Sequence, residues 1–98
     1  MKPDIKSRLQ KDFGEDFLTI VKVINQWDVE TKSLLDDRLL RVTIYLVKGK
    51  KEEFERIKEI ARLDFRDVLW QAEYDGGEER IRDFNRQFGS EETPPITQ

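Results

Sequence analysis

The sequence contains no cysteine and no histidine. Without cysteine the chain cannot form a disulfide, use a thiolate nucleophile or hold zinc through sulfur. Without histidine it lacks the side chain that titrates nearest to neutral pH and the commonest metal ligand. Carboxylates could still act as acid and base without histidine. We identify no catalytic, cofactor-binding or metal-binding residue, and the composition favours a protein that is not an enzyme.

Long apolar runs are also missing. No run approaches the roughly 20 residues that a membrane-spanning helix needs, and the opening stretch MKPDIKSRLQKD has no continuous apolar region of the kind found in a signal peptide. We therefore expect a cytoplasmic protein that does not contact a membrane.

Charge is abundant but balanced. Charged residues make up 40% of the chain, against a usual fraction near 25%. The 18 basic and 21 acidic residues are interleaved and leave a formal charge of −3, which gives no strong field for attracting nucleic acid. Three lysines, Lys48, Lys50 and Lys51, surround Gly49, but the rest of a phosphate-binding loop and interleaved aromatic residues are absent. We expect no nucleic-acid partner.

The densest apolar block is LLDDRLLRVTIYLV, residues 34–47, and it predicts a central helix over 34–48. At about 100° per residue, its apolar side chains fall on two nearly opposite faces. One face holds Leu35, Leu39, Val42 and Leu46, and the other holds Leu40, Ile44 and Val47. A helix with two apolar faces is usually enclosed by others. We therefore predict an all-α fold, a small antiparallel bundle of four or five helices around this central helix.

The other helices are predicted from apolar spacing and from the residues at their ends. The first of them begins at Pro3 and ends before Gly14. The following ones are predicted over 16–27, 50–63, 65–74 and 78–88. Residues 28–32 are expected to connect two helices, and Ser33 to cap the central one. Asp64 either caps a separate helix over 65–74 or lies within one helix that continues from 50–63.

Two further expectations concern organisation. The stretches 17–24 and 40–47 are rich in β-branched residues, so an α+β fold with strands there remains the alternative. Residues 1–89 are expected to form one helical domain, with Ile81, Phe84 and Phe88 facing inward from the last helix. The polar stretch 90–98, with Pro94 and Pro95, is expected to be a disordered tail.

The segment FRDVLWQAEY, residues 65–74, has more apolar positions than one buried stripe requires. An inward face is predicted to hold Phe65, Val68, Leu69 and Ala72. The opposite side combines aromatic and charged residues and is the candidate interface: Arg66, Asp67, Trp70, Glu73 and Tyr74. An aromatic pair inside a charged rim is typical of a binding hot spot. The alternative is that the first helix, the last helix or the tail covers Trp70 and Tyr74 in the monomer.

These patterns favour an interaction module that binds another protein or itself as a homodimer. One alternative function is a carboxylate-based, Mg²⁺-dependent enzyme or regulator that uses Glu52, Glu55, Asp64 and Asp67. Their three-residue spacing resembles that of the all-α nucleotide pyrophosphohydrolases, but Glu79 is followed three positions later by Arg82 in place of the second acidic turn of that family. The other alternative is an acidic antagonist of a basic partner protein.

Overall fold

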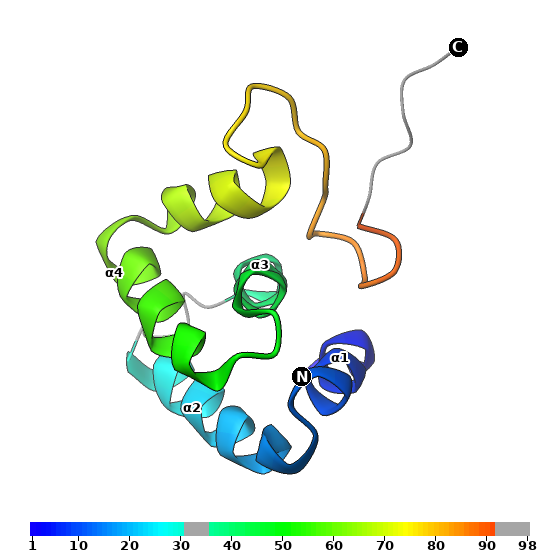
Figure 1. Cartoon of the computed structure of the whole chain (residues 1–98), viewed down its shortest axis with the longest axis vertical. Helices are drawn as coiled ribbons and strands as arrows, with labels where there is room; N and C mark the ends of the chain where they lie inside the picture. Colours follow the sequence, from blue (N-terminus) through cyan, green and yellow to red (C-terminus); the bar gives the residue numbers. More distant parts are fainter. Residues whose placement is uncertain (31–35, 92–98) are drawn as a thin grey trace.

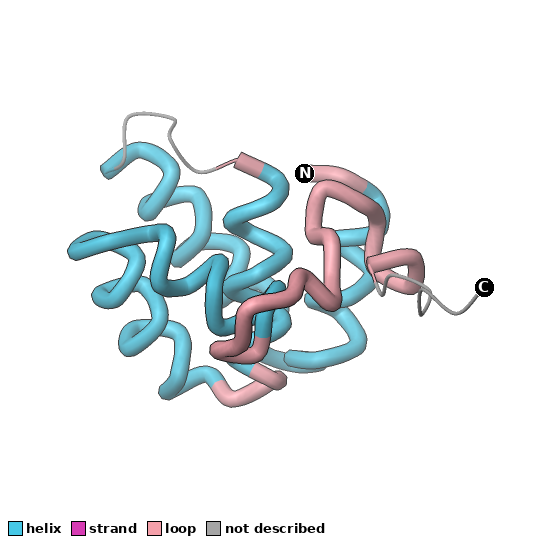
Figure 2. The backbone as a smooth tube through the Cα atoms, turned by 90° about the horizontal axis from the view of Figure 1, so that it is seen from above, coloured by secondary structure: helices cyan, strands magenta, loops and turns pink. Residues whose placement is uncertain are grey.

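The computed structural model describes residues 1–30 and 36–91. Its α-helices are α1 (Pro3–Phe13), α2 (Phe17–Glu30), α3 (Asp37–Val47) and α4 (Lys51–Tyr74), and a short 3-10 helix, η1 (Gly14–Asp16), joins α1 to α2. No strand occurs in the described ranges (Figure 2). The all-α fold class is therefore confirmed. The α+β alternative is wrong, because the two β-branched stretches lie within α2 and α3.

Helix α3 lies in the middle of the molecule, with α4 and α2 along one side and α1 on the other (Figure 1). The consecutive residues from Leu40 to Ile44 are all buried, and so is Val47. A run of buried positions longer than one stripe means that neighbours cover most of the helix circumference. The predicted central, enclosed helix is therefore confirmed.

The start of α3 differs from its prediction. The helix begins at Asp37, and the Oδ1 atom of Asp36 accepts a hydrogen bond from the Leu39 amide at 2.8 Å. Asp36 is thus the N-cap. The predicted cap Ser33 and the apolar Leu35 lie outside the described residues.

Helices α1 and α2 form over most of their predicted ranges, and each buries one apolar stripe. In α1 these residues are Ile5, Leu9 and Phe13, and in α2 they are Ile20, Ile24 and Trp27. The predicted connection over 28–32 is wrong in its first part, because α2 continues to Glu30. Its last turn is supported by a hydrogen bond from Gln26 to Glu30 and by an ion pair between Glu30 and Lys58 of α4 at 3.8 Å.

Helix α4 is one element with a break inside it. Asp64 has the extended torsion angles φ −160° and ψ 101°, and its Oδ1 accepts a hydrogen bond from the Arg66 amide at 3.0 Å. Asp64 therefore caps the second half of α4, as the first of the two alternatives expected. The two halves nevertheless follow each other directly, as the second alternative expected. The result is a bend between the two halves of α4 (Figure 1).

The predicted last helix, over 78–88, is wrong. These residues form loop and turns, and we call residues 80–91 the strap (Figure 1). The strap contains two tight turns. One is closed by the hydrogen bond from Arg86 N to Asp83 O, and the other by the bond from Ser90 N to Gln87 O. Phe84 is accordingly buried and Phe88 partly buried, although no helix carries them.

The finer expectation of an antiparallel bundle of four or five helices is not confirmed, because α4 is bent at Asp64 and loop and turns replace the helix predicted over 78–88. Of the expected tail, residues 90 and 91 belong to the strap, and 92–98 lie outside the described residues. No helix in the described part of the chain is both long and apolar enough to cross a membrane.

Candidate functional site

The predicted interface residues all lie in the half of α4 that follows the bend. Arg66 and Asp67 are exposed, Trp70 is 48% exposed and Tyr74 is half-buried. The structure corrects the assignment of Glu73, which is completely buried and cannot contact a partner. Glu73 lies on the side of α4 that the strap covers, because its Oε2 accepts a hydrogen bond from the Phe84 amide of the strap.

The Trp70 side chain is hydrogen-bonded through its indole nitrogen and partly exposed to solvent. Its indole Nε1 donates a hydrogen bond to the Gly77 carbonyl at 3.0 Å, and its ring lies 3.8 Å from where a Cβ on Gly76 would stand. The turn after α4 therefore covers part of the ring. The cover comes from this turn, whereas the alternative named the first helix, the last helix or the tail, and close to half of the Trp70 side chain remains accessible.

The bend brings further apolar side chains to the surface. Leu63 is 74% exposed and Phe65 is 52% exposed. The inward orientation predicted for Phe65 is wrong, because the extended backbone at Asp64 resets the helical register at this point. We call this part of α4 the bend surface, defined by Leu63, Phe65, Arg66, Asp67 and Trp70.

Glu73 is the centre of a buried ionic cluster that the sequence did not reveal. Its Oε2 accepts hydrogen bonds from Arg38 Nε at 3.2 Å, Arg80 Nη2 at 3.1 Å and the Phe84 amide at 3.0 Å. Its Oε1 accepts another from Arg38 Nη2. A buried carboxylate needs such partners, because burial without them would favour the protonated form. Glu73 thereby joins α3, α4 and the strap.

A second ionic cluster joins α1, α3 and the strap. Arg41 forms a two-point contact with Asp4, from Nε to Oδ2 at 2.9 Å and from Nη2 to Oδ1 at 3.1 Å. Its Nη1 donates to the carbonyl oxygens of Phe84 and Asn85 at 3.2 and 3.3 Å. Asp4 Oδ2 also accepts a hydrogen bond from the Phe88 amide at 3.0 Å. Planar two-point pairing is the geometry for which arginine is suited.

Both carboxylates have pKa values below their usual ones. For Asp4 the main cause is the hydrogen bond from Arg41, which outweighs the opposing effect of burial. For Glu73 burial is the largest single influence and raises the pKa. The hydrogen bonds from Arg38, the Phe84 amide and Arg80 together lower the pKa by more than burial raises it. Both groups therefore remain ionised at neutral pH.

We expect acid to destabilise the chain through these two groups. Because their folded pKa values lie below the usual 3.8 and 4.5, the unfolded chain binds more protons as the pH falls. Their stabilising contribution is complete above about pH 5.5 and decreases as the pH falls toward the folded pKa values. Urea unfolding between pH 7 and pH 3 measures this change. A Glu73→Gln variant should show a flatter dependence, and an identical slope would contradict the role of Glu73.

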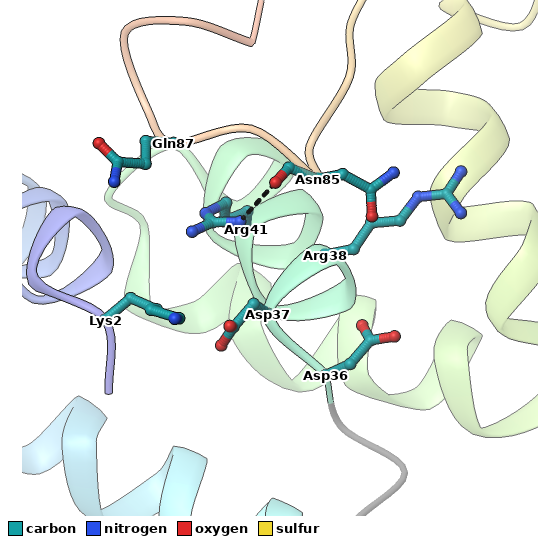
Figure 3. A pocket seen from close by; sticks show the side chains of 7 residues that line it. All are labelled: Lys2, Asp36, Asp37, Arg38, Arg41, Asn85 and Gln87. Atoms are coloured by element: carbon teal, nitrogen blue, oxygen red, sulfur yellow. Dashed lines mark hydrogen bonds between the residues drawn. The ribbon is translucent and has the colours of Figure 1, made fainter.

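The structure also contains a polar pocket of about 430 Å³ between α1, α3 and the strap (Figure 3). It is lined by Lys2, Asp36, Asp37, Arg38, Arg41, Asn85 and Gln87. The Arg38 side chain points away from the pocket, toward α4 (Figure 3). Since Arg38 and Arg41 are engaged with Glu73 and Asp4, the remaining lining carries both signs of charge and does not select one class of ligand.

Two of the four carboxylates of the alternative metal site form ion pairs with basic side chains. Asp64 pairs with Arg66 and Glu55 with Lys58, while Glu52 and Asp67 are exposed. Among the residues that the structure describes, no group of three or more carboxylates is arranged to hold a metal ion.

A scan against protein-family models and searches of the curated proteins and of the solved structures found no match to this chain. Function is therefore inferred from the geometry alone.

Proposed function

We propose that this chain is a protein–protein interaction module without catalytic activity, and that it binds through the bend surface. The supporting observation is the exposure of three large apolar side chains, Leu63, Phe65 and Trp70, within a short part of one helix. Single exposed apolar residues are ordinary, but a group with tryptophan and arginine resembles the centre of known binding surfaces.

The charges around this surface support a second copy of the chain as the partner. Arg62 pairs with Glu59 and Arg66 with Asp64, while Asp67 is exposed without a described ion pair. Both signs of charge therefore alternate along the same part of α4. In a twofold-symmetric dimer each surface meets its own copy, so a surface with both signs can match itself. A strongly acidic or basic partner would meet as much repulsion as attraction.

A variant with Leu63→Ser and Phe65→Ser should associate at least about tenfold more weakly, because truncating apolar hot-spot residues commonly costs 2 kcal/mol or more of binding free energy. Both side chains are exposed, so helical content should be unchanged. Sedimentation equilibrium over a hundredfold concentration range measures the association.

The matched control is Leu18→Ser, which removes an equally exposed leucine from α2. It should leave association unchanged. A wild-type chain that is monomeric at every concentration would rule out self-association through the bend surface. No contact in the described structure favours the metal-dependent or the acidic-antagonist alternative. The cytoplasmic location stays a prediction.

A further inference from the structure

The strap is held through its main chain by charged side chains that are themselves buried. The Phe84 amide donates to Glu73, and the Phe84 and Asn85 carbonyls accept from Arg41. Glu73 and Arg41 are 0% and 4% exposed. The Phe88 amide in turn donates to Asp4. Binding of main-chain groups by fixed polar groups, together with contacts to selected side chains, is a general way in which proteins recognise peptide segments.

Aromatic contacts supply the side-chain part of this recognition. The Phe84 ring lies 5.2 Å from the Tyr45 ring of α3 and 6.3 Å from the Phe88 ring. The Arg82 guanidinium lies 4.8 Å from the centre of the Tyr45 ring, and Arg8 of α1 lies 4.8 Å from that of Phe88. The helices therefore hold a segment that is folded into two turns and has the pattern Arg-x-Phe-x-x-x-Phe. We call the residues that hold it the strap-binding surface: Asp4, Arg8, Arg41, Tyr45 and Glu73.

The helical part of the chain has a core of its own. Among the described residues, every buried apolar side chain except Phe84 lies between Ile5 and Ala72. The connector between α4 and the strap, residues 75–79, is exposed along its whole length and contains Gly76 and Gly77. Departure of the strap would therefore remove the buried Phe84 and the partly buried Phe88 from the core and open two ionic clusters, while the other buried apolar side chains belong to α1–α4. Such a segment is suited to open as a unit.

We propose that the strap-binding surface also accepts the strap of a second copy, so that two chains exchange straps. The second copy is the partner that the contacts specify, because its strap has the same sequence and can form every bond described above. The chain's own strap is favoured at low concentration, since its effective concentration is on the order of millimolar. The strap-binding surface shares no residue with the bend surface, although the connector contacts Trp70 through Gly76 and Gly77.

Binding of a strap in trans is tested with a labelled peptide of residues 80–91 and the full-length Phe84→Ala chain. The variant keeps the strap-binding surface but weakens its own strap. The peptide should bind this variant at least tenfold more tightly than it binds the wild-type chain, and a Phe84→Ala peptide should bind the variant at least tenfold more weakly. Equal binding in all three cases would overturn the proposal.

Exchange between full-length chains is tested with Gly76→Val, which does not depend on the folding of the Phe84 variant. Gly76 has φ +76°, a conformation that a β-branched residue strongly disfavours, so the substitution strains the closed connector. The dissociation constant of the dimer should then be at least fivefold lower, whereas Glu79→Val in the same connector should leave it unchanged.

Both substitutions are placed in a chain that also carries Leu63→Ser and Phe65→Ser. A dimer that persists there arises from strap exchange, and one that disappears arises from the bend surface. Gly76→Val chains that remain monomeric in this background would overturn the proposal without affecting the proposed function.

Discussion

Replacement of Glu73 by alanine should lower the free energy of unfolding by about 2–3 kcal/mol, a large effect for one residue. The change leaves Arg38 and Arg80 without their shared carboxylate and the Phe84 amide without an acceptor. Removing one partner of a fully buried ion pair commonly costs 3–5 kcal/mol. We expect less here, because the side chains of Arg38 and Arg80 are about one-third exposed and can regain water.

Urea unfolding at pH 7 measures this difference, and Glu55→Ala is the matched control. Glu55 lies on the same helix, but its side chain is 72% exposed and contacts only Lys58 among the described ion pairs. Its removal should change the free energy of unfolding by less than about 0.5 kcal/mol. Similar losses for the two variants would mean that the Glu73 cluster contributes no more than a surface ion pair.

Replacement of Arg41 by methionine should destabilise the chain by about 3–4 kcal/mol. Methionine fills much of the space but leaves Asp4 as a nearly buried carboxylate without its cation, and the side chains of this pair are only 5% and 10% exposed. It also removes the donor to the Phe84 and Asn85 carbonyls. Thermal and urea unfolding both measure the loss.

A double-mutant cycle separates the ion pair from the other contacts of Arg41. Asp4→Asn combined with Arg41→Met removes both charges, so the double variant should be more stable than the sum of the two single losses predicts, by about 2 kcal/mol. Strict additivity would show that Asp4 and Arg41 act independently.

Local patterns in the sequence predicted most of the helices. The spacing of Ile5, Leu9 and Phe13 matches the buried stripe of α1, and the two apolar faces of residues 34–47 matched the enclosed position of α3. The error at 78–88 has a physical cause. Two successive turns place Phe84 and Phe88 on one side as a helical turn would, so periodicity alone could not separate them.

The ionic clusters were missed because their partners are distant in the chain. Arg41 pairs with a residue 37 positions away and Glu73 with one 35 positions away. One local signal was present for Arg41, which interrupts the densest apolar block of the sequence. For Glu73 the only hint was its neighbour Ala72 on the predicted inward face. The exposure of Phe65 depended on the conformation of a single residue, Asp64, which helical periodicity does not encode.

The hydrogen bond from the Phe88 amide to Asp4 has a kinetic consequence, because it joins residues 84 positions apart. Contacts between distant parts of a chain form against a larger loss of chain entropy than local ones. Helix formation and the pairing of α3 with α4, which are close in sequence, can precede this contact. We therefore expect the contact between the strap and α1 to be among the last to form during folding.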